Sequence, residues 1–273
     1  MLKMEEHYLK SLFLINSHTH IGDAFIKIPG KKYSVEELVA PVYGYKHRML
    51  EKASKEKVIN GMKKTIDLME KAGTNAFVDF REGGIEGIKL LKKALDGRKI
   101  EAIILGRPKE MKYNENEVDS ILSIAHGMGL SSISDWNEDI EKIAEHAHKR
   151  KKIFALHVSE AKRENIDEVL KLKPSFIVHL CMASKRDIEK VAEEDIPVVI
   201  CPRSNAFFGL RPKIELLMEY NATIMLGTDN AMVVEPDIVE ELKYTIKNFE
   251  IDEKEAIKMV SSNPKKVFKE FLI

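Results

Sequence analysis

The sequence has no glutamine, only two cysteines and no long hydrophobic run in its 273 residues. Cys181 and Cys201 cannot supply a disulfide framework to a chain of this length, so a buried core must hold the fold. No stretch of about eighteen apolar residues appears, which argues against a membrane-spanning helix. The first residues, MLKMEEHYLK, lack the continuous apolar stretch of a signal peptide. We therefore expect a cytoplasmic protein without a membrane partner.

An excess of charge of either sign is also absent. Lysine plus arginine and aspartate plus glutamate each number 44, so the formal net charge is zero. Nothing then draws the whole molecule to nucleic acid, and we expect a small-molecule substrate, with a homo-oligomer left open. The lack of glutamine, together with abundant lysine and glutamate, is typical of heat-adapted proteins and predicts a thermophilic protein. A drift in genome composition would give the same bias.

Short apolar, β-branched runs alternate with longer amphipathic segments along most of the chain. The runs are too continuously apolar for half-exposed antiparallel strands, and they favour a parallel sheet that is covered on both faces. The predicted strands are Leu12–Ser17, Thr74–Phe80, Ile100–Leu105, Leu130–Asp135, Ile153–His157, Phe176–His179, Val198–Cys201 and Thr223–Gly227. The clearest helical patterns between them are Asn137–Arg150, Arg163–Lys171, Lys185–Glu194 and Asp237–Asn248.

This alternation favours an α/β fold, specifically a TIM-type (β/α)8 barrel, with a doubly wound sheet as the alternative. The tail Asp252–Ile273 predicts one or two C-terminal closing helices, broken at Asn263-Pro264. No linker, repeat or low-complexity stretch stands out, so we expect a single domain over residues 1–273.

The connection between the first two predicted strands is unusually long, at more than fifty residues. A helix is predicted near Glu51–Lys71, and the segment Gly22–Met49 precedes it. Long connections in compact domains tend to be lids or binding loops. We therefore predict that Gly22–Met49 is a lid, while an ordinary surface insertion stays an alternative.

Histidine and aspartate side chains follow several of the predicted strands. His18 and His20 stand two residues apart where the first strand ends, so their imidazoles point to the same side. His157 and His179 close the fifth and sixth strands, and Asp229 follows the eighth. In a barrel these ends meet at the C-terminal mouth, where barrel enzymes carry their chemistry. Imidazoles and a carboxylate in that arrangement suit a divalent transition metal.

The same residues resemble a known family. The set His18-Thr19-His20, His157-Val158-Ser159-Glu160, His179 and Thr228-Asp229 resembles the amidohydrolase superfamily, in the branch of adenosine, cytosine and guanine deaminases and chlorohydrolases. The stretch CPRSNAFFG at Cys201–Gly209 is similar to a segment of adenosine-deaminase-like enzymes. SSNPKKVF, near Ser261, is similar to the closing segment of the cytosine deaminase and chlorohydrolase group.

The resemblance implies a metal-dependent hydrolase acting on carbon–nitrogen bonds other than peptide bonds. His18, His20, His157 and Asp229 would bind one divalent metal, with Zn²⁺ favoured and Fe²⁺ as the alternative. The metal would lower the pKa of water and so supply a nucleophile. Asp229 would also act as a base, His179 would hydrogen-bond the reacting centre, and Glu160 would shuttle a proton to the ring nitrogen and the leaving amine.

Two departures from the resemblance leave alternatives open. The β-sandwich usual in the chlorohydrolase group is missing from the pattern, and Asp229-Asn230 stands where adenosine deaminases have two aspartates. Asp135, at the end of the fourth predicted strand, keeps a second metal open. Substrate contacts are predicted at the mouth for Arg81, Glu82, Trp136, Arg203 and Asn205. Helix capping or a surface ion pair is the alternative for each of them.

Three functions are therefore weighed. The first is a deaminase of a nitrogen heterocycle such as a nucleobase, nucleoside or pterin. The second keeps the metal site but cleaves an amide, a cyclic imide or a carbon–halogen bond. The third is a catalytically inactive barrel that serves as a binding protein. Glu160 favours the first, because amide-cleaving relatives with two metals usually lack an acid at that position, and the intact ligand set disfavours the third.

Overall fold

The computed structural model describes residues 8–9, 11–30, 32–136 and 139–272. Its strands form one sheet in the order β8-β7-β6-β5-β4-β3-β2-β1-β9, and every neighbouring pair is parallel. The bounds are β1 Leu14–His20, β2 Thr74–Arg81, β3 Glu101–Gly106, β4 Gly127–Leu130, β5 Ile153–Val158, β6 Phe176–His179, β7 Val198–Ile200, β8 Ile224–Leu226 and β9 Asp229–Asn230.

The two ends of this sheet meet and close it into a barrel. β8 pairs with β7, whereas β9, which is separated from β8 by two residues, pairs with β1 through Thr19 and His20. Between them the Gly227 N–H donates to the Ile200 carbonyl and the Thr228 N–H donates to the His18 carbonyl, each at 3.0 Å. β8 and β9 therefore act as one interrupted eighth strand. The predicted TIM-type barrel is confirmed, and the doubly wound alternative is wrong.

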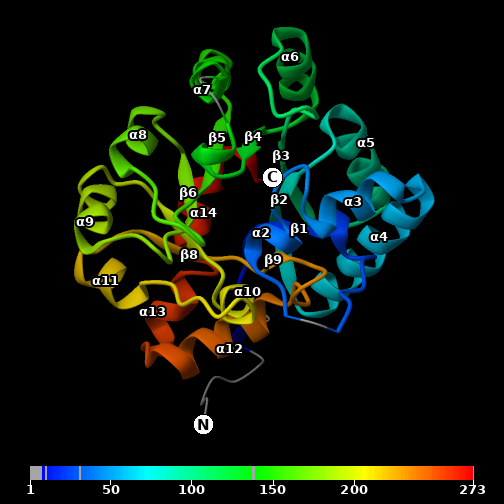
Figure 1. The fold of residues 1–273 in the computed structure, drawn as a ribbon. Coiled ribbons are helices and arrows are strands. Elements are labelled where there is room, and N and C mark those ends of the chain that lie inside the picture. Colours follow the sequence, from blue (N-terminus) through cyan, green and yellow to red (C-terminus); the bar gives the residue numbers. More distant parts are fainter. Residues whose placement is uncertain (1–7, 10, 31, 137–138, 273) are drawn as a thin grey trace.

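The helices surround the strands, and Figure 1 views the barrel with the helices arranged around it. Their bounds are α2 Val35–Leu38, α3 Tyr45–Lys52, α4 Lys55–Lys71, α5 Gly84–Leu95, α6 Glu115–Ile124, α7 Asp139–Lys149, α8 Ile166–Lys171, α9 Lys185–Glu193, α10 Pro202–Phe207, α11 Ile214–Glu219, α12 Ile238–Phe249, α13 Glu253–Lys258 and α14 Ser262–Phe268. Several begin after a residue whose side chain accepts a backbone N–H of the first turn, namely Ser34, Ser54, Asn114, Asn165, Ser184, Asp237 and Asp252.

Two hydrophobic cores follow from the alternation of side chains along the strands. The larger core lies between strands and helices, and the smaller fills the barrel interior with residues such as Ile15, Val78 and Phe176. Phe268 of α14 belongs to the inner core and packs edge-to-face on Phe176 at a centroid distance of 5.4 Å. The C-terminal helix therefore contributes to the barrel interior, as expected of a closing helix.

The predicted bounds of the fourth strand are wrong. The strand was predicted at Leu130–Asp135 but runs over Gly127–Leu130, and Ile133–Asp135 is a short 3-10 helix. A Cβ at Gly127 would lie 2.1 Å from the Ile153 carbonyl oxygen, and one at Gly129 would lie 2.7 Å from the Phe80 ring. Glycine is required there because neighbouring groups approach closely, although glycine is depleted in strands generally.

The predicted break at Asn263-Pro264 is also wrong. Both residues lie in the first turn of α14, where proline needs no intrahelical N–H partner, and the interruption falls between α13 and α14 instead. The predicted helix Asn137–Arg150 corresponds to α7, with positions 137–138 outside the described residues. In the part of the chain that the structure describes, no helix is both long and apolar enough to cross a bilayer.

Replacing Gly127 by alanine tests the close approach of β4 to β5. We expect Gly127→Ala to lower the free energy of unfolding by about 1–3 kcal/mol or more, because the added methyl must displace backbone atoms. Gly30→Ala is the matched control, since among the described residues no atom outside its chain neighbours lies within 4 Å of a Cβ built there. Chemical denaturation of both variants measures the difference, and equal stabilities would contradict the packing described for β4.

Candidate metal centre and active site

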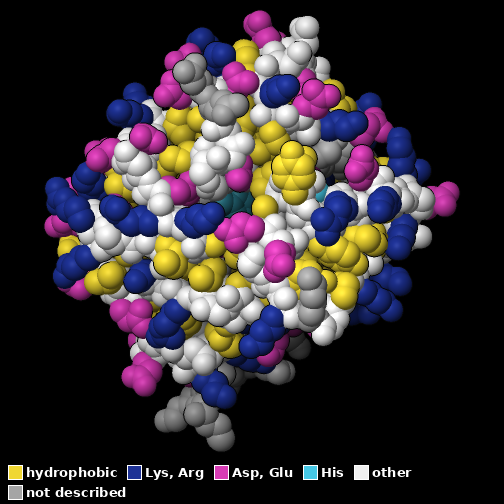
Figure 2. Space-filling model, in the orientation of Figure 1, with side chains coloured by type: hydrophobic (Ala, Val, Ile, Leu, Met, Phe, Trp, Pro, Cys, Tyr) yellow, Lys and Arg dark blue, Asp and Glu magenta, His cyan; other side chains and the backbone are white. Residues whose placement is uncertain are grey.

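The predicted site residues meet at the carboxyl ends of the strands. His18 and His20 end β1, His157 lies in β5, His179 ends β6 and Asp229 begins β9. The last two have left-handed backbone conformations, with φ of 85° at His179 and 64° at Asp229. Such conformations cost free energy in residues other than glycine and concentrate at functional sites. Figure 2 shows histidine side chains at the floor of a hollow near the middle of this face.

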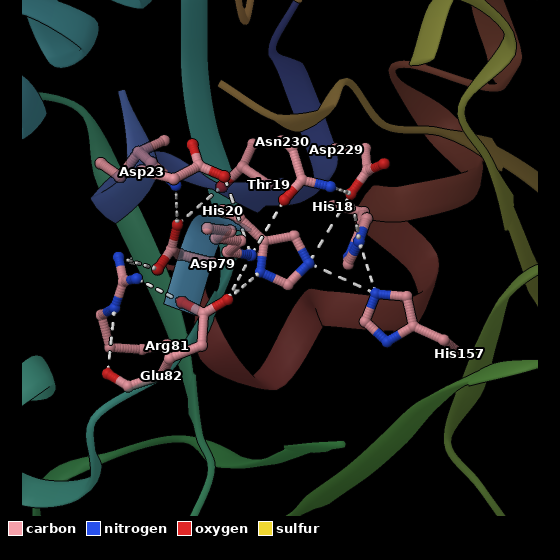
Figure 3. A network of polar contacts seen from close by, with 12 residues as sticks. His18, Thr19, His20, Asp23, Asp79, Arg81, Glu82, His157, Asp229 and Asn230 are labelled. Atoms are coloured by element: carbon pink, nitrogen blue, oxygen red, sulfur yellow. Dashed lines mark hydrogen bonds and ion pairs between the residues drawn. The ribbon is translucent and has the colours of Figure 1, made fainter. Parts of the chain in front are cut away.

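Four of the separations between the ligand atoms of His18, His20, His157 and Asp229 suit a tetrahedral metal site (Figure 3). The His157 Nε2 atom lies 3.1 Å from His18 Nε2 and 3.3 Å from His20 Nε2. The Asp229 Oδ1 atom lies 3.4 Å from His18 Nε2 and 3.6 Å from His20 Nε2. Bonds of about 2.0–2.2 Å to a tetrahedral zinc ion would place ligand atoms about 3.3–3.6 Å apart. The predicted ligand set therefore fits a metal ion.

The other ring nitrogens explain why a cation belongs between these atoms. The His157 Nδ1 atom lies 2.8 Å from the Leu130 carbonyl oxygen, and His20 Nδ1 lies 2.9 Å from Glu82 Oε1. Both acceptors require an N–H on Nδ1, so each Nε2 carries a lone pair. Two lone pairs facing each other at 3.3 Å repel, and a metal ion removes that repulsion.

His179 belongs to the same cluster but has different hydrogen bonding. One atom each from His18, His157, His179 and Asp229 all lie within 4.8 Å of one another. The amide nitrogen of Asn205 donates to His179 Nδ1 at 3.2 Å, so the ring proton lies on Nε2. His179 Nε2 is 3.7 Å from Glu160 Oε1, and both atoms are buried without a hydrogen-bond partner among the described residues. His179 is therefore arranged as a donor toward a bound molecule.

The two buried carboxylates of the site have opposite pKa shifts. Burial, assisted by the nearby Asp229 charge, raises the pKa of Glu160 well above its usual range. Burial also opposes ionisation of Asp229, but hydrogen bonding to His18 and the proximity of His179 hold its pKa well below the ordinary value. Burial lowers the pKa of His18, His157 and His179, and that of His20 to about 3. Neutral imidazoles are the form that binds a metal.

Two polar side chains, one from α10 and one from β9 itself, fix Asp229. Its Oδ2 atom accepts from the Ser204 hydroxyl at 2.6 Å, and its Oδ1 atom accepts from the Asn230 amide at 2.8 Å. Ser204 and Asn205 lie in α10, so the CPRSN stretch positions both Asp229 and His179. Ser204 was not predicted, although its place beside the recognised Arg203 and Asn205 could have suggested it.

A buried ionic network extends from His20 (Figure 3). Glu82 contacts His20, Lys46 and Arg81, and Arg81 also pairs with Asp79 at 3.2 Å. Lys46 comes from α3, within the predicted lid, and its Nζ donates to Asn230 Oδ1 at 2.9 Å. Sequence reasoning missed Lys46 and Asp79, because nothing in their local pattern distinguishes them from other charged residues.

The residues predicted to contact substrate lie in several different places. A cavity of about 160 Å³ opens at the mouth, and Glu82 and Asp135 are among the residues that line it. Arg81, Trp136, Arg203 and Asn205 do not line this cavity, so their placement gives no support to direct substrate contact. Arg81 pairs with Glu82, the Trp136 indole donates to Ser131, and Asn205 holds His179. The Arg203 guanidinium contacts the Glu235 carbonyl at 3.2 Å.

Asp135 lies apart from the cluster of histidines and aspartate that could hold a metal ion, which we call the metal-type cluster: His18, His157, His179 and Asp229. It lines the cavity but is not one of the described residues that group with His18, His157, His179 and Asp229. Its side chain therefore gives no support to a second metal beside the first.

Comparison with known proteins identifies the family. The Amidohydrolase family matches residues 14–270. An uncharacterized protein of Methanocaldococcus jannaschii is 37% identical over 94% of this chain and 72% of its own length. A protein of Archaeoglobus fulgidus named "Putative aminohydrolase" is 36% identical over 88% of this chain and 69% of its own length. The barrel, the mouth and these matches agree, and the chain belongs to the amidohydrolase family.

Solved structures with the same fold include deaminases and chlorohydrolases. An adenosine deaminase of Xanthomonas campestris with bound zinc superposes with a TM-score of 0.74. It is 14% identical and covers 94% of this chain and 67% of that chain. The fold is therefore shared with these hydrolases; members of the amidohydrolase family typically bind a metal, and His18, His157, His179 and Asp229 of this chain form a cluster that could hold one.

The metal content of variants tests which histidines are ligands. We expect about one transition metal per chain, most of it lost in the double variant His18→Ala with His20→Ala, because two of four ligands are removed. His179→Gln should keep the metal, since His179 Nε2 carries a proton. Elemental analysis after dialysis against a chelator measures both. Full retention by the double variant, or loss from His179→Gln alone, would contradict the ligand set.

Proteolysis tests whether Gly22–Met49 is a lid. Val39, Ala40 and Lys46 line the cavity, so the segment covers the mouth, while Tyr43 within it is 81% exposed. Lys46→Met removes the positive charge that pairs with Glu82 and holds the segment in place. We expect chymotrypsin to cut after Tyr43 about tenfold faster in this variant, because local opening becomes easier. Lys52→Met, which changes an exposed residue of the same helix, is the control. Equal cleavage of both variants would favour a plain surface insertion.

Proposed function

We propose that the protein is a metal-dependent aminohydrolase that removes ammonia from a nitrogen heterocycle such as a nucleobase, nucleoside or pterin. The observation that carries this proposal is the position of Glu160. Its buried carboxyl group lines the cavity, follows the candidate ligand His157 by three residues and faces the Nε2 atom of His179. An acid that holds its proton near neutral pH suits a reaction in which an amine must leave.

A metal ion would be held by His18, His20, His157 and Asp229. When bound, it would lower the pKa of water and so make a nucleophile available near neutral pH. Zinc is the metal we favour, because three imidazoles and one carboxylate at tetrahedral spacing suit it, and the adenosine deaminase of X. campestris was solved with zinc. Iron(II) would accept the same ligands.

The protein side chains divide the proton transfers between them. Asp229, ionised in its buried site, takes a proton from the attacking water. Glu160 gives its proton to the ring nitrogen, which makes the adjacent carbon electrophilic. It then takes up the proton that remains on the added hydroxyl and gives it to the departing amine, and the proton held by Asp229 restores the acid form of Glu160. The His179 N–H donates to the oxygen that develops at the reacting carbon. Water thus adds to the carbon, the carbon–nitrogen bond breaks, and ammonia leaves.

Replacement of Glu160 separates this reaction from other uses of the same site. Glu160→Gln keeps the size of the side chain but cannot give or take the proton. We expect it to keep its metal while turnover falls by about 10²–10⁴, the range of a missing general acid. Asp229→Ala should lose turnover and also bind the metal more weakly. Glu36→Gln is the control, because it changes a carboxylate at the rim of the same cavity.

The measurement is ammonia release from metal-loaded protein, screened first against nucleobases, nucleosides and pterins. Metal content is measured on the same samples. Normal turnover by Glu160→Gln with metal bound would remove the deaminase proposal. Cleavage of an amide, a cyclic imide or a carbon–halogen bond would then be the better explanation of the site.

A further inference from the structure

We propose that Arg107 forms a subsite for an anionic substituent of the substrate, a carboxylate or a phosphate, in the part of the cavity formed by the ends of β3 and β4. This inference rests on the proposed function, because it adds a substrate class to the same cavity. Arg107 directly follows β3, and its backbone N–H is fixed by the Arg81 carbonyl at 3.2 Å. Its side chain lines the cavity together with Asp135 and His47.

Among the described residues, Arg107 differs from the two lysines of the cavity in having no counter-ion. Lys46 pairs with Glu82, and Lys162 pairs with Glu36 at 3.1 Å. Within the described ranges, the Arg107 guanidinium makes neither a hydrogen bond nor an ion pair with a protein side chain. Five N–H donors on a half-buried cation are costly to leave unmatched. A planar carboxylate or a phosphate can accept two of them together.

The contrast with Arg81 supports this interpretation. Burial opposes the charge of both arginines, but Asp79 and Glu82 raise the pKa of Arg81, whereas the pKa of Arg107 is lowered by its burial. The nearest acids do not supply the missing partner. Glu82 is engaged by His20, Lys46 and Arg81, and burial raises the pKa of Asp135 and so favours its neutral form. An anion from outside the chain would complete the charge balance.

The position of Arg107 in the barrel assigns it to recognition rather than chemistry. The metal-type cluster and Glu160 come from β1, β5, β6 and β9 or directly follow them. Arg107 and Asp135 follow β3 and β4, on a separate arc of the mouth. A heterocycle with its reacting carbon at the cluster would extend a second substituent over this arc. Ser131 and Ser132 also line it and offer further hydrogen bonds.

The test compares matched ligands that differ by one anionic group. Calorimetry on the zinc-loaded Glu160→Gln protein measures binding without the proposed turnover. Adenosine is compared with adenosine 5′-monophosphate for the phosphate arm, and pterin with pterin-6-carboxylate for the carboxylate arm. In at least one arm we expect the charged ligand to bind about tenfold more tightly or better. Adding Arg107→Met should abolish that advantage and leave the neutral ligand unchanged.

Lys162→Met is the matched control, because it removes a positive charge from the same cavity that is already paired. It should preserve the advantage of the charged ligand. A second readout uses unaltered zinc-loaded protein: titration with inorganic phosphate and with acetate, followed by the ¹⁵N resonance of the Arg107 Nε–H. A saturable shift of this resonance on adding either anion indicates binding at Arg107. The shift should persist in Lys162→Met, because that variant leaves Arg107 unchanged.

No advantage in either arm together with no saturable Arg107 shift would overturn the proposal. If neither ligand pair binds, the Arg107 resonance decides by itself. Equal losses for charged and neutral ligands in Arg107→Met would also overturn it, since they indicate a general structural role. Ammonia release is not part of this test. Failure of anion binding therefore leaves the deaminase proposal standing, and a failed deaminase screen leaves the subsite standing.

Discussion

The structure depends above all on bringing three imidazoles and a carboxylate together at one buried point. His18, His20, His157 and Asp229 place their ligand atoms 3.1–3.6 Å apart, and the lone pairs of His20 Nε2 and His157 Nε2 face each other. Such an arrangement is stable in a protein only if its environment holds each group and a cation balances it. The surrounding residues can be understood from this requirement. Glu82, Leu130, Ser204 and Asn230 each fix one of these groups by a hydrogen bond or an ion pair.

A second constraint joins the long connection after β1 to this centre. Lys46 reaches from α3 to Glu82 and Asn230, and these two residues contact His20 and Asp229. Opening the segment would therefore uncover a buried carboxylate beside a candidate metal ligand. Gly22 permits the arrangement, because a Cβ at that position would lie 2.1 Å from the Arg81 guanidinium. Covering the mouth and orienting His20 are in this way properties of a single network.

The sequence predicted the barrel and most of the cluster because both depend on local signals. Continuous apolar runs mark buried parallel strands, and a histidine or aspartate at the end of a run projects into the mouth. β4 was misplaced, because Gly127 and Gly129 are in that strand for reasons of close approach that only neighbouring strands reveal. Trp136 and Arg203 were predicted at the mouth from their position after strands, yet Trp136 donates to Ser131, and Arg203, in α10, donates to the Glu235 carbonyl. Partners such as Lys46 and Asp79 depend on tertiary contacts and leave no local pattern.

The opposite pKa shifts of Glu160 and Asp229 follow from unequal surroundings rather than from residue type. Both side chains are carboxylates, and burial disfavours the charge of each. Asp229 lies against His18 and accepts hydrogen bonds from Ser204 and Asn230, and these contacts stabilise its ionised form. Glu160 has no such donors among the described residues, and the charge of Asp229 further disfavours its ionisation. Two titratable groups separated in this way can act as base and acid at the same pH.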